Sequence, residues 1–187
     1  MSVRQVAEWA AKRLKGDLHY RLAPELATGE LLAVLWGRGL AYLRGLCWRW
    51  RLGACGGHFF VGRRVSLQHA NKLLIGRGVT LEDDVRIDAL SQRGVRLGNH
   101  VTIAKFTIIE ATGVLSQLGE GREMGDHSNL GDFCFVGAAG GVRIGRNVLI
   151  GQRVSFHSEN HRFERVDVPI REQGVSRQGI VVEDDCW

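Results

Sequence analysis

The chain has 187 residues and a formal net charge of +5, which is enough for one domain with an attached segment. The charge is unevenly placed, because residues 1–64 hold 11 Lys and Arg against 4 Asp and Glu, a net of +7, whereas residues 65–187 hold 14 against 16, a net of −2. The basic character therefore belongs to the amino-terminal segment, and we expect no nucleic-acid-binding face on the rest of the chain.

Two helices are predicted in the amino-terminal segment. Residues 4–15 are rich in Ala and free of helix breakers, and residues 29–51 are rich in Leu, Trp and Tyr and are interrupted by Arg. The second stretch is too charged to cross a bilayer. Its composition fits a helix at a membrane interface and fits a helix that caps a repeat domain equally well. We expect residues 1–57 to form this basic cap or peripheral membrane contact, with a Gly-rich hinge at 53–57.

The four cysteines, Cys47, Cys55, Cys134 and Cys186, show no metal-binding spacing, and the first residues do not read as a secretory signal. We therefore expect reduced thiols in a cytoplasmic protein, and no nucleophilic cysteine.

A six-residue repeat fills residues 58–187 and is clearest from Met124 to Phe156. Each hexad begins with an apolar residue, often followed by Gly, and its fifth residue is mostly small or β-branched. The first positions are Val61, Leu67, Ile75, Leu81, Ile87, Leu97, Ile103, Ile109, Met124, Leu130, Val136, Ile144, Ile150, Phe156 and Val182. The fifth positions are Val65, Asn71, Val79, Val85, Val101, Thr107, Gly113, Ser128, Cys134, Gly140, Val148, Val154 and Cys186.

A period of six fits neither a helix nor a single alternating strand, but it fits short strands separated by sharp corners. The first and fifth residues would point inward, and Gly, Asp, Asn and Arg would occupy the corners. Three sides make one triangular coil, and coils stack about 4.8 Å apart by strand pairing. An ordinary β-sandwich is the alternative, but it has no reason to keep a six-residue register.

Insertions interrupt the repeat at three places and are expected to form external loops, often on the binding face. The first two follow residues 88–91 and 110–113, which we expect to lie near one another at one edge; we also expect residues 112–123 to form a loop. The third, residues 157–179, is polar and contains Pro169. A structureless excursion of this length in a tight repeat domain is usually functional.

Several short motifs inside this pattern resemble those of a known protein family. They are residues 144–151 (IGRNVLIG), 158–163 (SENHRF), 169–170 (PI), 173–174 (QG) and 183–187 (EDDCW). Together with the hexads, over residues 59–187, the chain resembles the bacterial hexapeptide-repeat acyltransferases. Within that family it is most similar to the branch that O-acetylates sugars and polysaccharides.

The resemblance implies a mainly β fold, the left-handed parallel β-helix, and a homotrimer that transfers acetyl groups from acetyl-CoA to a hydroxyl of a sugar or polysaccharide precursor. His161 matches the catalytic histidine of the family, and a neutral imidazole suits a general base at working pH. Glu159 or another carboxylate would orient its second nitrogen, and Glu159, Asn160 and His157 are the residues expected to bind the acceptor. No metal is expected.

Trp187 matches a tryptophan that lies beside the acyl donor in relatives, although an exposed terminal tryptophan is the plain alternative. In relatives further coils follow this point and form the coenzyme A groove with a neighbouring subunit. This chain ends in mid-hexad, so we expect the repeat domain to be incomplete at its carboxyl end. The resemblance also favours a location at the inner face of the membrane.

Two other functions remain open at this stage. A zinc hydratase of the γ-carbonic-anhydrase kind would use His127, His157 and His161 from adjoining subunits as ligands. A non-catalytic, truncated scaffold is the other.

Overall fold

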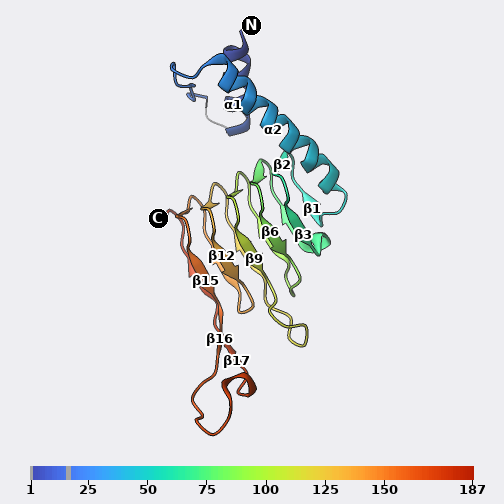
Figure 1. Ribbon diagram of the computed structural model, residues 1–187, viewed down its shortest axis with the longest axis vertical. Coiled ribbons are helices and arrows are strands. Elements are labelled where there is room, and N and C mark those ends of the chain that lie inside the picture. The colour runs from blue at the N-terminus through green and yellow to red at the C-terminus, as the bar shows by residue number, and fades with distance from the viewer. Residues whose placement is uncertain (1, 16–17) are drawn as a thin grey trace.

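In the computed structural model, which describes residues 2–15 and 18–187, two helices precede eighteen short strands and two 3₁₀ helices (Figure 1). Helix α1 spans Val3–Lys15 and helix α2 spans Thr28–Arg49, close to the predicted helices. The 3₁₀ helices are Ala70–Lys72 and Ile170–Glu172.

Three parallel sheets form the body of the protein. Sheet A consists of β1 (Ala54–Cys55), β4 (Leu73–Ile75), β7 (Val95–Leu97), β10 (Arg122–Met124), β13 (Val142–Ile144) and β18 (Ile180–Val182). Sheet B consists of β2 (Phe59–Val61), β5 (Val79–Leu81), β8 (Thr102–Ile103), β11 (Asn129–Leu130) and β14 (Leu149–Ile150). Sheet C consists of β3 (Ser66–Gln68), β6 (Arg86–Asp88), β9 (Ile108–Glu110), β12 (Phe135–Gly137) and β15 (Ser155–His157).

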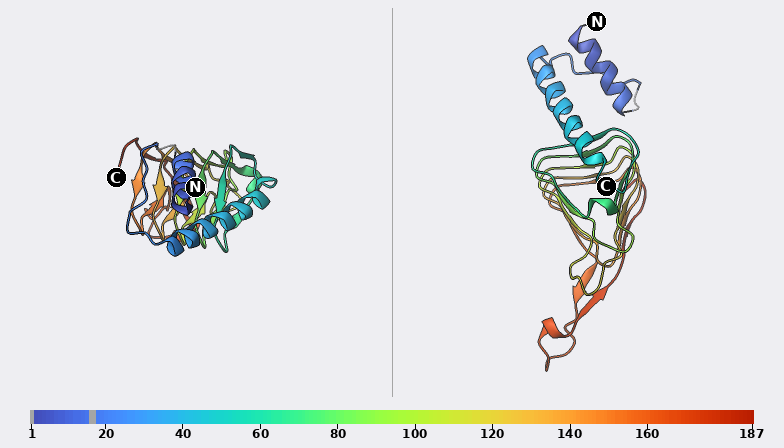
Figure 2. Two further views of the ribbon diagram at one scale, coloured as in Figure 1. Left: turned by 90° about the horizontal axis from the view of Figure 1, so that it is seen from above. Right: turned by 90° about the vertical axis from the view of Figure 1, so that its right-hand side faces the viewer.

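The chain visits sheets A, B and C in turn, and from β4 to β15 each strand pairs with the strand three places earlier; β18 pairs with β13. Seen along the stack, the successive turns superpose in a roughly triangular outline (Figure 2). One antiparallel hairpin, β16 (Glu159–His161) with β17 (Val175–Arg177), interrupts this order between β15 and β18. The prediction of a mainly β protein is confirmed, and the arrangement is consistent with a β-helix-like solenoid.

In sheets A and B the strands end on the first position of a hexad and begin at the fifth or sixth position before it, whereas in sheet C they cover the sixth, first and second positions. In β5, for example, Val79 and Leu81 are fully buried, while Thr80 between them is partly exposed. Parallel pairing sets Leu81 beside Ile103 of the next turn, so like residues stack on like residues in a continuous interior.

Two residues predicted to point inward do not. Asn71 is exposed in the 3₁₀ helix Ala70–Lys72, and Gly113 is exposed in the loop between β9 and β10. At both places the chain has left the stacked turn, so the register of the repeat no longer fixes which residue faces the core.

At the corners from sheet A to B and from sheet B to C, the fourth position of most hexads has a left-handed backbone. His100, Phe106 and Phe133 have φ values of 56°, 58° and 57° there, although bulky residues rarely adopt this conformation. Ring stacking offsets the cost of this backbone conformation, because Phe106 and Phe133 lie face to face with ring centroids 4.8 Å apart. His100 stacks on His127 in the same way at 4.9 Å.

Helix α2 packs along strand β2, where its Gly45 meets the backbone of Phe59 so closely that a Cβ would lie 1.9 Å from the carbonyl oxygen. Arg44 fixes the contact by donating from Nε to the carbonyl of Val61 at 2.8 Å. Helix α1 lies beside α2 (Figures 1 and 2). Within the described residues, neither helix is long and apolar enough to cross a membrane.

The predicted hinge at residues 53–57 is not a hinge. Strand β1 lies within it and pairs in parallel with β4, so the first turn of sheet A begins at Ala54. Its glycines instead allow close approach: a Cβ on Gly53 would lie 2.4 Å from the carbonyl oxygen of Asn71.

The insertions lie where the sequence placed them, with one correction. Asp88 and Glu110 are register partners in sheet C, as expected for segments at one edge, and residues 111–121 form a loop. Residues 157–179 are not structureless, because they contain the β16–β17 hairpin and a 3₁₀ helix.

Candidate functional site

The candidate site is built on the β16–β17 hairpin, which extends from the corner between sheets C and A (Figure 1). Ser158 anchors its base. This residue is 2% exposed, and its Oγ donates to the carbonyl of Gly137 at 2.8 Å while accepting from the amide of Gly140 at 2.9 Å. The hairpin is therefore fixed to the preceding turn.

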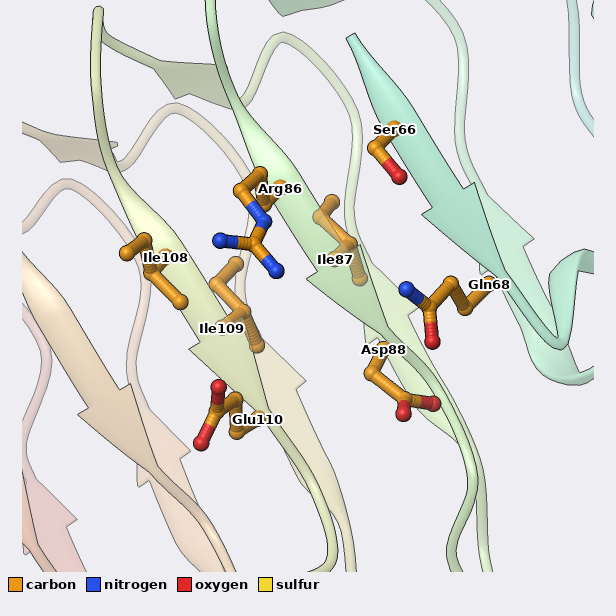
Figure 3. Close-up of a pocket in the computed structure, with 8 residues that line it drawn as sticks. All are labelled: Ser66, Gln68, Arg86, Ile87, Asp88, Ile108, Ile109 and Glu110. Atoms are coloured by element: carbon orange, nitrogen blue, oxygen red, sulfur yellow. The ribbon is translucent and has the colours of Figure 1, made fainter.

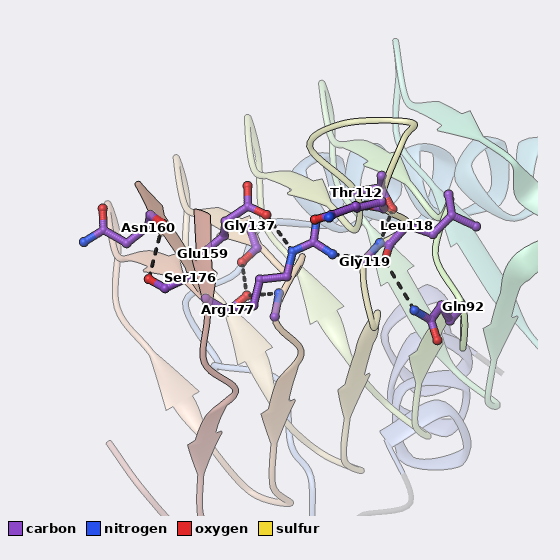
Figure 4. A network of polar contacts seen from close by, with 12 residues as sticks. Gln92, Thr112, Leu118, Gly119, Gly137, Glu159, Asn160, Ser176 and Arg177 are labelled. Atoms are coloured by element: carbon purple, nitrogen blue, oxygen red, sulfur yellow. Dashed lines mark hydrogen bonds and ion pairs between the residues drawn. The ribbon is translucent and has the colours of Figure 1, made fainter. Parts of the chain in front are cut away.

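Arg177 connects the hairpin to the loop between β9 and β10 (Figure 4). Its Nε pairs with Oε2 of Glu159 at 2.7 Å. Its two terminal nitrogens donate to the carbonyls of Leu118 and Gln117 at 3.2 and 2.9 Å. A single half-buried guanidinium thus joins the two longest insertions of the chain.

The loop that receives Arg177 is itself braced. The hydroxyl of Thr112 donates to the carbonyl of Leu90 and accepts from the amide of Gly119 at 2.9 Å. Gln92 donates to the carbonyl of Leu118 at 3.4 Å (Figure 4). The hairpin therefore rests on a loop that is fastened to the turn before it.

Four predicted site residues lie together on this hairpin. His157, Glu159, Asn160 and His161 line an open hollow of about 480 Å³. His161 is exposed opposite Val175, and its ring makes no hydrogen bond or ion pair with the residues that the structure describes. An exposed, unpartnered imidazole beside a hollow is available to accept a proton from a bound molecule.

The neighbours of His161 are differently placed. Asn160 is exposed, and its backbone carbonyl accepts from the hydroxyl of Ser176 at 3.3 Å. His157 lies on the outer face of sheet C with its ring 5.3 Å from that of Phe135. The carboxylate of Glu159 is held by Arg177, and no hydrogen bond joins it to His161 in the described chain.

Trp187 is fully exposed at the carboxyl end, away from the hairpin (Figures 1 and 2). Within one chain, the structure does not bring it to the hollow beside His161. Its predicted contact with an acyl donor stays a prediction.

A second hollow, of about 70 Å³, lies on the outer face of sheet C (Figure 3). It places Arg86 near the register partners Asp88 and Glu110. The carboxylate of Asp88 already contacts Nδ1 of His69 at 2.8 Å and the amide of Leu90 at 3.0 Å. The carboxylate of Asp88 is therefore engaged in local contacts, and the hollow is too small to hold a sugar.

The described residues contain no group of three or more His, Cys, Asp and Glu that could hold a metal ion. His127, one of the three histidines considered as zinc ligands, stacks on His100 at the corner between sheets A and B. His157 and His161 lie instead at the sheet C side and on the hairpin.

Two notable residues were missed by the sequence reasoning. Arg177 gives no local signal, because its partners come from distant segments. Arg122 does give one: it fills the fifth position of the hexad before Met124, and that position points inward. It is 3% exposed, and burial lowers its pKa to about 9.

No family model, curated protein or solved structure matches this chain.

Proposed function

We propose that this protein is an O-acetyltransferase that moves an acetyl group from acetyl-CoA to a hydroxyl of a sugar or polysaccharide precursor, with His161 as general base. The observation that supports this most is the placement of His161. Its imidazole is exposed and unpartnered among the described residues, on a hairpin fixed to a rigid repeat, beside a hollow that it shares with Asn160 and His157.

In the proposed reaction, a ring nitrogen of His161 takes the proton of the acceptor hydroxyl as its oxygen attacks the thioester carbonyl. The carbon–sulfur bond then breaks, and the proton passes to the leaving coenzyme A thiolate, which gives an ester and free coenzyme A. Backbone N–H groups near the hairpin would stabilise the oxyanion. No covalent intermediate on the enzyme is required.

The remaining residues would position the two substrates. Asn160 and His157 would contact the acceptor, because both are exposed at the hollow. Glu159 would act through Arg177 by fixing the hairpin, and Trp187 would contact acetyl-CoA. In this proposal the solenoid is a left-handed parallel β-helix and the protein a homotrimer acting in the cytoplasm, where acetyl-CoA is supplied.

The proposal is tested by release of coenzyme A from acetyl-CoA in the presence of a panel of sugar and oligosaccharide acceptors. Replacing His161 with Ala should lower turnover by about 100-fold or more, the usual contribution of a general base. The matched control is His127→Asn, because His127 is exposed on another corner and Asn tolerates its φ of 60°. Unchanged turnover in His161→Ala, or an equal loss in the control, would contradict the proposal.

A further inference from the structure

Helix α2 presents an apolar stripe to solvent. It comprises Leu32, Trp36, Leu40, Leu43, Cys47 and Trp50, the last at the helix end; all are exposed. Steps of three and four residues place them on one face. Trp36 is 72% and Trp50 is 93% exposed, which is far more than a packed tryptophan would be. We call these six residues the α2 stripe.

The α2 stripe lies opposite the face that packs on the repeat domain, except that Leu40 also lines the hollow between α2 and sheet B. Gly45, which meets strand β2, is displaced around the helix axis by roughly half a turn from Leu43 and Cys47. The stripe is therefore not needed to hold α2 in place.

The arginines of α2 do not interrupt the stripe. Arg38 lies over the ring of Phe60 at 5.6 Å, and Arg44 binds the carbonyl of Val61. Arg49 and Arg51 are exposed near the carboxyl end of the stripe. The α2 stripe is thus uncharged, has cations at its margin, and belongs to a segment of net charge +7 over residues 1–64. Such a surface is complementary to a partner that has an apolar interior beneath an anionic outer layer.

We infer that the α2 stripe docks on the surface of a lipid bilayer that contains anionic phospholipids. The helix would lie in the plane of the interface, with Trp36 and Trp50 at the level of the headgroups. The nineteen residues from Leu32 to Trp50 extend over about 27 Å along the helix axis, because each residue rises about 1.5 Å, which gives a contact line rather than a spanning segment.

A second copy of the chain fits this surface less well. A helix–helix seam through Leu32, Trp36 and Leu43 would also pass through Gly39, where a side chain would meet open space. Coiled-coil seams instead use similar aliphatic residues that fit matching holes, whereas fluid lipid adapts to an irregular row of side chains. Two copies would also bring two segments of net charge +7 together.

The test is flotation of the full chain with large unilamellar vesicles of phosphatidylcholine alone, or of three parts phosphatidylcholine to one part phosphatidylglycerol. We expect binding to the anionic vesicles to be about tenfold tighter than to the neutral ones, and salt to weaken it. The variant Trp36→Ser with Trp50→Ser should bind at least roughly tenfold more weakly, because each substitution removes a large buried apolar surface from the lipid contact.

The matched control is Phe163→Ser with Leu115→Ser, which removes two large apolar residues that are 66% and 80% exposed elsewhere. It should bind like the unaltered chain, and circular dichroism should show that both variants keep the fold. Equal binding to neutral vesicles, no binding to anionic ones, or equal binding by the α2-stripe variant would overturn the inference. The inference would also be overturned if sedimentation showed a dimer that the α2-stripe substitutions abolish while binding to the vesicles stays unchanged. The result does not depend on the proposed catalytic function.

Discussion

Replacing Arg122 with Met should stabilise the protein, although Arg122 lies in the core. The side chain points into the interior from the middle of sheet A, with Val95 and Val142 as its register partners. In the described structure, Nε and Nη1 have no hydrogen-bond partner, and Nη2 contacts only Sδ of Met124 at 3.3 Å.

The size of the effect follows from these contacts. A buried polar group without a partner costs about 1–3 kcal/mol, and replacing a buried ion with an apolar residue of similar volume often gains about 1–4 kcal/mol. Met is shorter than Arg, but it is unbranched and flexible and fills irregular gaps in a core, so it leaves only a small cavity. We expect the free energy of unfolding to rise by about 2 kcal/mol, which corresponds to roughly 4–8 °C in Tm for a chain of this size.

Thermal and urea unfolding followed by circular dichroism measure this change. The control is Arg143→Met on the neighbouring strand, where the side chain is exposed and the change should stay within about 0.5 kcal/mol. A loss of stability in Arg122→Met would refute the reasoning, because it would mean that the guanidinium is satisfied inside the repeat.

Three further predictions concern the attachment of α2, the hairpin and the corners. Gly45→Ala should lower the free energy of unfolding by about 2 kcal/mol, since the new methyl would lie 1.9 Å from a carbonyl oxygen of β2. Gly39→Ala, which meets open space, should not lower it, and equal Tm losses in the two variants would count against this packing. Arg177→Ala should increase proteolysis and amide exchange within residues 159–177 with little change in Tm; an unaltered exchange pattern would show that the hairpin does not depend on this residue. Hydrogen bonds from the side-chain and backbone amides of Asn99 hold the pKa of Asp126 below its ordinary value of 3.8. The stabilisation is complete above that value and is lost as pH falls through the lowered pKa, so Tm should fall less steeply below pH 3.8 in Asp126→Asn than in the unaltered chain; parallel Tm curves would contradict this.

The repeat could be predicted because its physical cause is local. An apolar first residue such as Leu130 or Val136 must be buried. Because side chains alternate along a strand, the residue two places before it, which is the fifth of the preceding hexad, faces inward as well. The prediction failed for Asn71 and Gly113, where the chain leaves the stacked turn. The left-handed corner at Phe133 could not be predicted from propensity, because stacking on a distant residue decides it.

The candidate site was only partly readable for the same reason. The placement of His161 in an insertion signalled an exposed residue, but the antiparallel pairing of β16 with β17 depends on contacts across a long polar segment. The ion pair between Glu159 and Arg177, and the link onward to Leu118, join residues that are up to 59 positions apart. Nothing in the neighbouring sequence announces such contacts. Arg122 is different, because its place at the fifth position of a hexad predicts an inward side chain.

The most direct test of the account is transfer of labelled acetyl from [1-¹³C]acetyl-CoA, with the product examined by NMR. We expect a new ester carbonyl signal on a sugar acceptor with the unaltered chain, and its loss in a folded His161→Ala variant. An ester signal of the same size in that variant, or none with any acceptor while the unaltered chain is folded, would contradict it.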